Sequence, residues 1–326
     1  MRRLLVPLLE FAPLLFLLLG CQPAAPETDS ARQDHNHTLT YQWARDASLQ
    51  FRFDLSQEID ITAGPRAIQN YTRILQNYRL ISNGNSGDAE LSLTMAFGDI
   101  DVSMKDEESE GRYNSASSAP PRTTLGSLLQ RSLGRIPKQE ITIQILRGNR
   151  IGKITNLDAV LESMTRQIPS TLKNMIFTIY GEDRIRQLIY LTPLPSGKLI
   201  DGFAWPIQET RRFALLGPTE LDGIAKLVNQ ETRNGKSLFQ IEISGKARKG
   251  ATQDDLSPQP YSLEQGTFQG RAWFDPEIGQ YSDSILTYKL DVSSTPASLN
   301  SNETPLSIQV TQKYATKLLS SSPTTN

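Results

Sequence analysis

Alternation of apolar and polar residues constrains this chain more than any other feature. Between residues 49 and 61 nearly every second side chain is apolar, with Gln, Arg, Asp and Ser between them. Successive side chains of a strand point to opposite faces of a sheet, so this stretch predicts a long strand with one dry face. Similar patterns predict strands at 71–81, 89–97, 100–104, 141–145, 151–154, 213–216, 220–228, 238–243, 266–274, 281–292 and 306–314. A phase shift at Gly98 predicts a bulge, and residues 275–279 predict a hairpin turn.

Helical spacing of apolar residues is confined to the middle of the chain. It covers 125–133 behind Thr124, 157–164 behind Asn156, and a third stretch from Ser170 to Leu191 whose residues 175–180 also fit a strand. Strands, then two or three helices, then strands favour the α+β class with mainly antiparallel pairing. The expected architectures are a curved sheet, a half-barrel or two packed sheets.

The domain boundaries follow from composition. Residues 39–315 are predicted to form the β-rich body, either as one unit or as two lobes that share a helical centre. Within it, residues 105–123 are polar and rich in Ser, Ala and Pro, which predicts a loop. The Ser- and Thr-rich tail, 316–326, is expected to fray.

The N-terminal segment predicts export. Arg2 and Arg3 precede an apolar stretch that runs into Gly20 and Cys21, the order of a secretory signal peptide over residues 1–20. Leu18, Gly20 and Cys21 resemble the lipobox of bacterial lipoproteins, which implies cleavage before Cys21 and a diacylglycerol on its thiol. Cys21 is the only cysteine, so it has no intramolecular disulfide partner.

The polar residues 21–38 then predict a flexible tether between the lipid and the body. Gln22 after the cysteine favours the outer membrane, facing the periplasm, if the cell has two membranes. We therefore expect the protein to be attached to the membrane, its expected partner, through the lipid on Cys21.

Charge and histidine content exclude several function classes. The chain has 34 basic and 35 acidic residues, and residues 1–20 contain two Arg and one Glu, so the mature chain is close to neutral and unsuited to nucleic acid. The only histidines, His35 and His37, lie in the predicted tether. Histidine-dependent catalysis and metal binding need rigidly held side chains, so we expect neither a metal nor a cofactor.

Several loose landmarks carry a family resemblance. They are Asp99–Ser103 followed by Arg112–Ser115, Gly148–Ile154 leading to Asn156, Leu194 and Pro195 followed by Gly202 and Trp205, and Gly270, Phe274, Asp275 and Gly279. From Tyr41 to Tyr314 this order resembles an uncharacterised family of exported bacterial β-rich lipoproteins, a domain of unknown function. Phe203 and Ala204 depart from the polar turn more usual there. The resemblance implies a fold and no activity.

The predicted architecture also resembles, more weakly, the half-barrel periplasmic lipoprotein carriers, in which a curved sheet cups an acyl chain against helices. This favours a non-catalytic binding or carrier protein for an apolar or lipid-like ligand enclosed between sheet and helices. The residues that would line such a space are Phe51, Phe53, Leu91, Leu93, Met95, Phe97, Met164, Met175 and Ile176. For each of these residues taken singly, a place in the core is the favoured interpretation, and a cavity beside residues 156–191 would distinguish the two.

Two other functions are compatible with the sequence. A structural or adaptor lipoprotein would recruit an envelope protein, with Trp43, Trp205 and Trp273 as candidate anchors. An enzyme would need carboxylates, and Asp99 and Asp101 share a strand face at a spacing of about 7 Å. We predict binding and no catalysis. Asp254–Asp255 and Glu182–Asp183 are interpreted as ordinary loop or helix charges, and the basic turn 245–250 as a solvated hairpin end.

Overall fold

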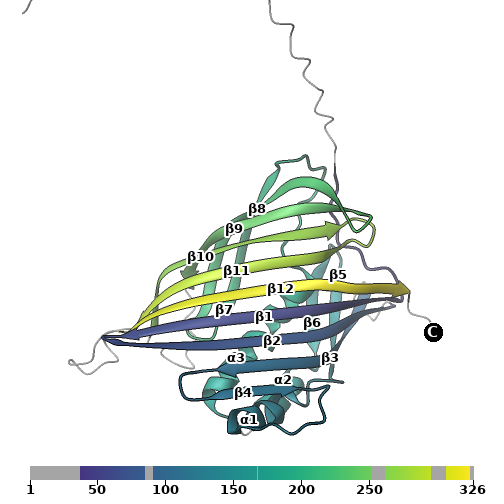
Figure 1. Cartoon of the computed structure of the whole chain (residues 1–326). Helices are drawn as coiled ribbons and strands as arrows, with labels where there is room; N and C mark the ends of the chain where they lie inside the picture. Colours follow the sequence, from purple (N-terminus) through teal and green to yellow (C-terminus); the bar gives the residue numbers. More distant parts are fainter. Residues whose placement is uncertain (1–36, 85–90, 167, 251–260, 295–305, 324–326) are drawn as a thin grey trace, which may run out of the picture. The chain divides into compact units, whose positions relative to one another are not determined.

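The structure is a computed structural model that describes residues 37–84, 91–166, 168–250, 261–294 and 306–323 (Figure 1). The predictions for residues 1–36, which include the signal peptide, lipidation of Cys21 and the role of His35, lie outside the described residues. The same holds for Asp254 and Asp255.

Twelve strands of the described chain form one antiparallel sheet. They are β1 (Ala47–Ala63), β2 (Arg66–Asn83), β3 (Leu91–Lys105), β4 (Glu110–Asn114), β5 (Glu140–Leu146), β6 (Arg150–Thr155), β7 (Ala204–Phe213), β8 (Gly217–Arg233), β9 (Lys236–Lys249), β10 (Tyr261–Asp275), β11 (Gln280–Ser294) and β12 (Ser307–Pro323). Their order is β6-β5-β3-β2-β1-β12-β11-β10-β9-β8-β7, and β4 pairs with β3 outside this path. β6 and β7 are the two edges, so the sheet curves without closing, as Figure 1 shows.

The centre of the sheet joins the two ends of the described chain. β1 pairs with β12 over its whole length, from Ala47 opposite Pro323 to Thr62 opposite Ser307. Strands from both halves of the sequence therefore belong to a single curved sheet, and the alternatives of two lobes or two packed sheets do not describe it.

Four helices lie between β4 and β7 in the sequence. They are α1 (Thr124–Leu133), α2 (Leu157–Thr165), α3 (Ser170–Tyr180) and α4 (Glu182–Ile189). The single helix predicted for 170–191 is thus two helices, and the break falls at Gly181, whose backbone is extended. A Cβ at Gly181 would collide with the carbonyl oxygen of Phe177, so glycine allows the chain to turn there. Tyr78 of β2 donates a hydrogen bond to the carbonyl of Leu188, which places α4 against the sheet.

Several local predictions are confirmed. The register between β2 and β3 shifts opposite Gly98, as expected for a bulge. β10 and β11 form the predicted hairpin, in which Asp275 pairs with Gln280. The first helix occupies the expected residues, although Thr123 rather than Thr124 is its N-cap and accepts a hydrogen bond from the Gly126 amide at 3.1 Å.

Other local predictions are wrong because distant pairing overrides composition. The tail expected to fray from residue 316 continues β12 to Pro323, since β1 supplies a partner strand along this length. The polar loop 105–123 contains β4, which pairs with β3. Residues 214–216, predicted as a strand, form the turn between β7 and β8. The basic turn 245–250 is largely strand, because β9 pairs with β8 as far as Lys249.

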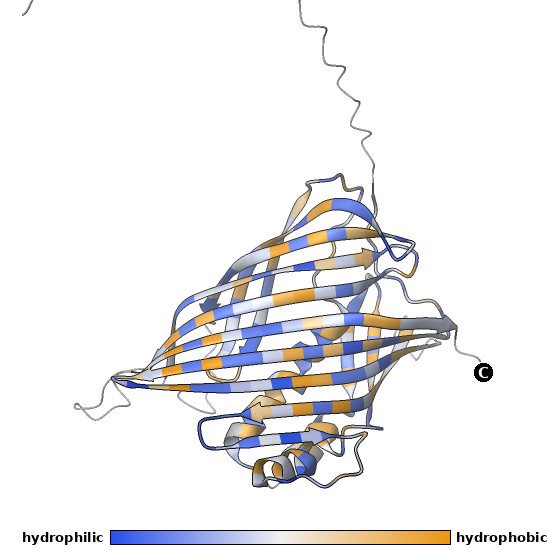
Figure 2. Ribbon diagram, in the orientation of Figure 1, coloured by the Kyte–Doolittle hydropathy of each residue, from blue (hydrophilic) through white to orange (hydrophobic). Residues whose placement is uncertain are grey.

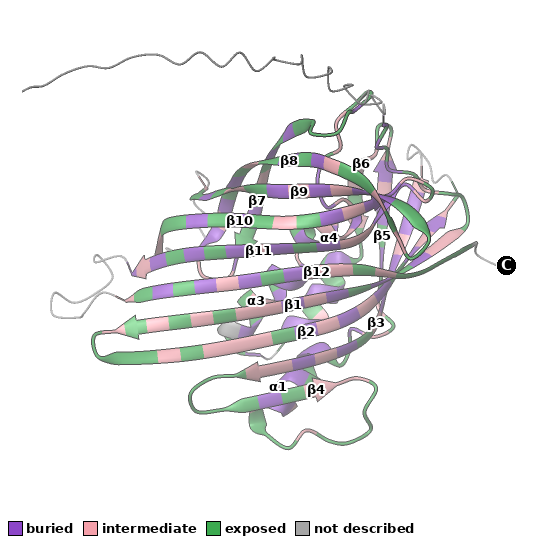
Figure 3. Ribbon diagram, turned by 45° about the horizontal axis from the view of Figure 1, so that its top comes forward, coloured by how far each residue is buried: buried purple, intermediate pink, exposed green. Residues whose placement is uncertain are grey.

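The apolar residues of each strand converge on a dense core. Figure 2 shows the alternating hydropathy along the strands, and Figure 3 shows that buried and exposed positions alternate in the same way. Seven residues proposed to line a ligand space are core residues: Phe51, Phe53, Leu93, Met95, Phe97, Met164 and Ile176. Leu91 and Met175 are partly buried against the same core. Burial of one such side chain contributes about 1.5–3 kcal/mol, so their apolar character is explained by stability.

No helix among the described residues is long and apolar enough to cross a bilayer.

Candidate functional site

An open cleft lies where the two edge strands of the sheet approach one face of α4. Its volume is about 670 Å³.

The lining of this cleft, called the seam cleft below, comes from five segments: 39–41, 148–151, 183–190, 193–196 and 209–211. It thus contains residues of the β5–β6 hairpin on one side, β7 on the other, and α4 between them.

Arg186 of α4 covers the β6 edge. Its guanidinium donates hydrogen bonds to the carbonyl oxygens of Ile151 at 2.9 Å and Gly152 at 3.2 Å. Glu182, one helical turn earlier, pairs with the same guanidinium at 2.5 Å and orients it. Edge strands present unpaired backbone groups, and Arg186 supplies hydrogen-bond donors to two carbonyls of this edge strand.

Glu209 and Arg211 form the β7 side of the seam cleft. The Arg211 guanidinium pairs with the Glu209 carboxylate at 2.8 Å and also donates to the Tyr288 hydroxyl. Arg211 is only 8% exposed. Its burial disfavours the charge, but Tyr288 and Glu209 outweigh this and raise the pKa of Arg211 above its ordinary value. The side chain therefore stays a cation inside the protein.

Arg184 lies on the core side of α4. Its guanidinium carbon is 3.5 Å from the ring centroid of Tyr314 and 6.0 Å from that of Phe53. One nitrogen donates to the side-chain oxygen of Gln187, and Gln187 lines the seam cleft. The Nε atom is buried without a hydrogen-bond partner among the described residues. Burial lowers the pKa of Arg184, and the nearby charge of Arg211 lowers it further.

Aromatic and proline residues form the apolar wall of the seam cleft. Tyr41 packs on Tyr190 with ring centroids 4.2 Å apart, and its hydroxyl donates to the Thr192 carbonyl at 2.8 Å. Trp43 donates to the Tyr190 hydroxyl at 3.0 Å. The apolar lining residues are Leu39, Tyr41, Ile151, Tyr190, Pro193, Leu194 and Pro195. The lining of the cleft thus combines apolar side chains with charged ones.

The tryptophans proposed as interface anchors have contacts inside the body. Trp43 bonds to Tyr190, as described above. Trp205 donates to the Pro193 carbonyl at 2.8 Å. Trp273 donates to Glu231 at 2.6 Å, and the guanidinium of Arg233 lies 4.1 Å from its ring centroid. Each indole N–H thus has an acceptor within the body.

The proposed carboxylate pair connects β3 to β4 and the turn that follows it. Asp101 accepts hydrogen bonds from Arg112 and Asn114, both at 3.0 Å. Asp99 accepts one from the Ser115 hydroxyl at 3.3 Å. Neither carboxylate lines the seam cleft.

Sequence reasoning missed Glu182 and Asp183, which were interpreted as ordinary helix charges. Asp183 lines the seam cleft, and Glu182 positions Arg186. The spacing of Glu182 and Arg186 was a visible signal for a helical ion pair, but no local pattern indicates what that pair contacts.

His37 belongs to the folded body and not to the predicted tether. Its backbone forms a β-bridge with Leu199, its ring lies 4.6 Å from that of Phe239, and its Nε2 is 3.5 Å from the Asp201 carboxylate. Among the residues that the structure describes, no three His, Cys, Asp or Glu side chains gather as a metal site.

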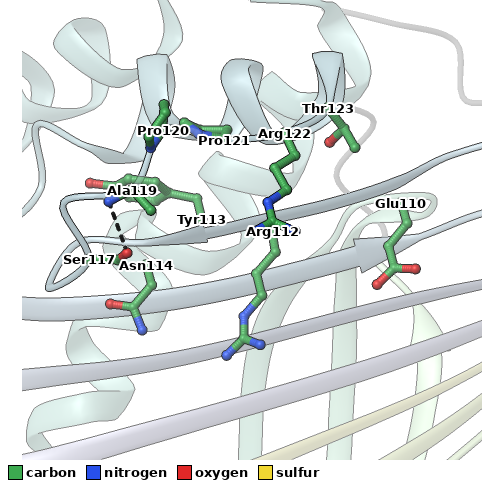
Figure 4. A pocket seen from close by; sticks show the side chains of 10 residues that line it. All are labelled: Glu110, Arg112, Tyr113, Asn114, Ser117, Ala119, Pro120, Pro121, Arg122 and Thr123. Carbon is green, nitrogen blue, oxygen red and sulfur yellow. Dashed lines mark hydrogen bonds between the residues drawn. The ribbon is translucent and has the colours of Figure 1, made fainter.

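A second hollow, of about 440 Å³, lies between β4 and the segment before α1 (Figure 4). Its polar groups serve local structure: Arg112 pairs with Asp101, and Ser117 accepts a hydrogen bond from the Ala119 amide at 3.2 Å. Thr123 caps α1. The seam cleft is larger and combines apolar side chains with the buried charge of Arg211, so we take it as the candidate site.

No protein-family model and no curated protein matches this chain. A solved structure described as lipid–protein interactions in lipovitellin matches 87% of this chain and 26% of its own, with a TM-score of 0.49 and 11% identity. A DUF1329 family protein from Desulfovibrio piger matches 83% of this chain and 86% of its own, with a TM-score of 0.13 and 7% identity. This chain spans only a minor part of the lipovitellin chain. Because both TM-scores are below 0.5, neither likeness supports an assignment of function.

Proposed function

We propose that this protein binds an amphiphilic, lipid-like molecule in the seam cleft without transforming it. The observation that carries the proposal is a lining that combines apolar side chains, among them Tyr41, Tyr190 and Leu194, with charged side chains of α4 and β7. A volume of about 670 Å³ lies within the range of sites for small ligands.

The seam cleft is a different place from the space between sheet and helices that the sequence suggested for a ligand. The side chains between sheet and helices pack as core, whereas the seam cleft is open to solvent and bordered by both sheet edges. A ligand there would place its apolar part on the aromatic wall and its polar part near Arg211.

The test is a fluorescence titration of detergent-free, delipidated protein with dansyl-undecanoic acid. Ser196→Trp introduces a bulky side chain at the exposed rim of the seam cleft, and Ser237→Trp makes the same change at an exposed position on β9. We expect Ser196→Trp to weaken binding at least about tenfold, and Ser237→Trp to bind like the unaltered protein. Equal binding by both variants, or no binding by the unaltered protein, would contradict the proposal.

We further propose that the protein is exported and anchored through lipid on Cys21. The support is the lipobox-like residues Leu18, Gly20 and Cys21 and the absence of any other cysteine. Labelling of expressing cells with an alkyne analogue of palmitate should mark the unaltered protein and not Cys21→Ala. Equal labelling of both would reject this anchor.

The adaptor and carboxylate-enzyme alternatives stay predictions. Crosslinking in intact cells that captures a stoichiometric protein partner would favour an adaptor. Turnover lost on Asp99→Asn would favour an enzyme.

A further inference from the structure

We propose that the seam cleft selects amphiphiles that carry an anionic group, held by Arg211 and by Arg184 behind it. This inference rests on the proposed binding function and names the ligand class.

The first observation is an imbalance of buried charge. Arg184 and Arg211 are 7% and 8% exposed, and both belong to the cluster around Tyr288 and Tyr314. Arg211 has a carboxylate partner in Glu209, whereas none of the described carboxylates forms an ion pair with Arg184. A buried cation is costly unless it is paired. The Tyr314 ring compensates part of this cost through a cation–π contact.

The second observation is the connection between this charge and the seam cleft. Gln187 accepts a hydrogen bond from Arg184 and itself lines the cleft, and Arg211 lines it directly. One side chain therefore separates the unpaired guanidinium from the space that a ligand would occupy. Both guanidiniums are buried, and charges interact more strongly in the interior of a protein than in water, so the two cations would attract an anion at this end of the cleft.

The apolar wall decides what kind of anion fits. Tyr41, Tyr190 and Leu194 offer a surface for an acyl chain or ring, which a free inorganic ion would leave exposed. A fatty-acid carboxylate and a lysophospholipid phosphate share the required chemistry.

The experiment compares dansyl-undecanoic acid with its methyl ester. We expect the unaltered protein to bind the acid at least about tenfold more tightly than the ester. Arg184→Met should remove most of this preference, whereas the exposed control Arg248→Met should retain it. Equal affinity for acid and ester in the unaltered protein would overturn the inference while leaving the proposed function intact. No binding of either probe would instead reject the proposed function.

A folding control and a competition experiment accompany this comparison. Circular dichroism establishes that Arg184→Met is folded, and if it is not, the acid-to-ester ratio of the unaltered protein decides. Competition of the bound acid by oleate and by lysophosphatidylglycerol then distinguishes a carboxylate from a phosphate ligand. Either competitor acting at lower concentration than neutral monoolein supports the inference, and monoolein competing equally well overturns it.

Discussion

The two faces of α4 differ in what they contact. On the core face, Ile185 and Ile189 are buried and Arg184 packs on Tyr314. On the seam face, Arg186 bonds to β6, and Asp183 lines the seam cleft. The core face shows that the inside of the curved sheet is filled by the protein itself. The seam face shows that polar side chains of α4 cover the β6 edge of the unclosed sheet. The seam cleft stays open beside them.

The largest effect should come from the core face. Ile185 is fully buried, so Ile185→Ala should reduce the free energy of unfolding by about 2–5 kcal/mol through lost burial and a cavity. Urea denaturation measures the change. Leu319→Ala, at an exposed apolar position on β12, should cost less than about 1 kcal/mol. Equal costs would mean that α4 does not pack on the sheet as described.

The next largest effect on stability should come from Gly181, which lies between α3 and α4. Gly181→Ala should lower stability by about 1–3 kcal/mol, because the added Cβ would collide with the Phe177 carbonyl. Gly84→Ala, where no atom lies within 4 Å of the added Cβ, is the matched control and should be nearly neutral. Thermal unfolding of both variants checks this, and a neutral Gly181→Ala would contradict the tight turn.

The seam face should contribute less. Arg186→Gln should cost about 1–2 kcal/mol, since two β6 carbonyls lose their donor. Arg166→Gln breaks a similar pair with Glu162 on α2 that is exposed, and should cost about 0.5 kcal/mol or less. Hydrogen exchange should also speed up in β6 for Arg186→Gln alone. Unchanged β6 exchange would show that Arg186 does not protect this edge.

The smallest effect should be pH-dependent. Partial burial, followed by the charge of Glu182, raises the pKa of Asp183. A carboxyl group whose pKa is raised on folding destabilises the fold as pH rises through that pKa, so the penalty is present at pH 7 and absent well below the ordinary carboxyl value. Asp183→Asn should therefore stabilise the protein at pH 7 by less than about 1 kcal/mol, after allowance for solvent screening. Urea denaturation at pH 7 and pH 3 checks this, with no gain expected at pH 3.

The candidate site was only partly predictable. Helical spacing located residues 182–189 within a longer helix, because apolar periodicity is a local property. It could not reveal that Arg184 is buried beside Tyr314, since charged residues are normally expected at the surface. Nor could it show that β6 and β7 border one cleft, because a local pattern does not indicate which distant strands lie close together in space.

The sequence by itself determined where most strands run and which side chains form the core, because the period of two is written into each segment. The tertiary structure alone decided that Ser320–Pro323 is strand, since only pairing with β1 at the other end of the chain orders it. It also decided where the seam cleft lies, because the curvature accumulated over the whole sheet determines the positions of the two edge strands, β6 and β7.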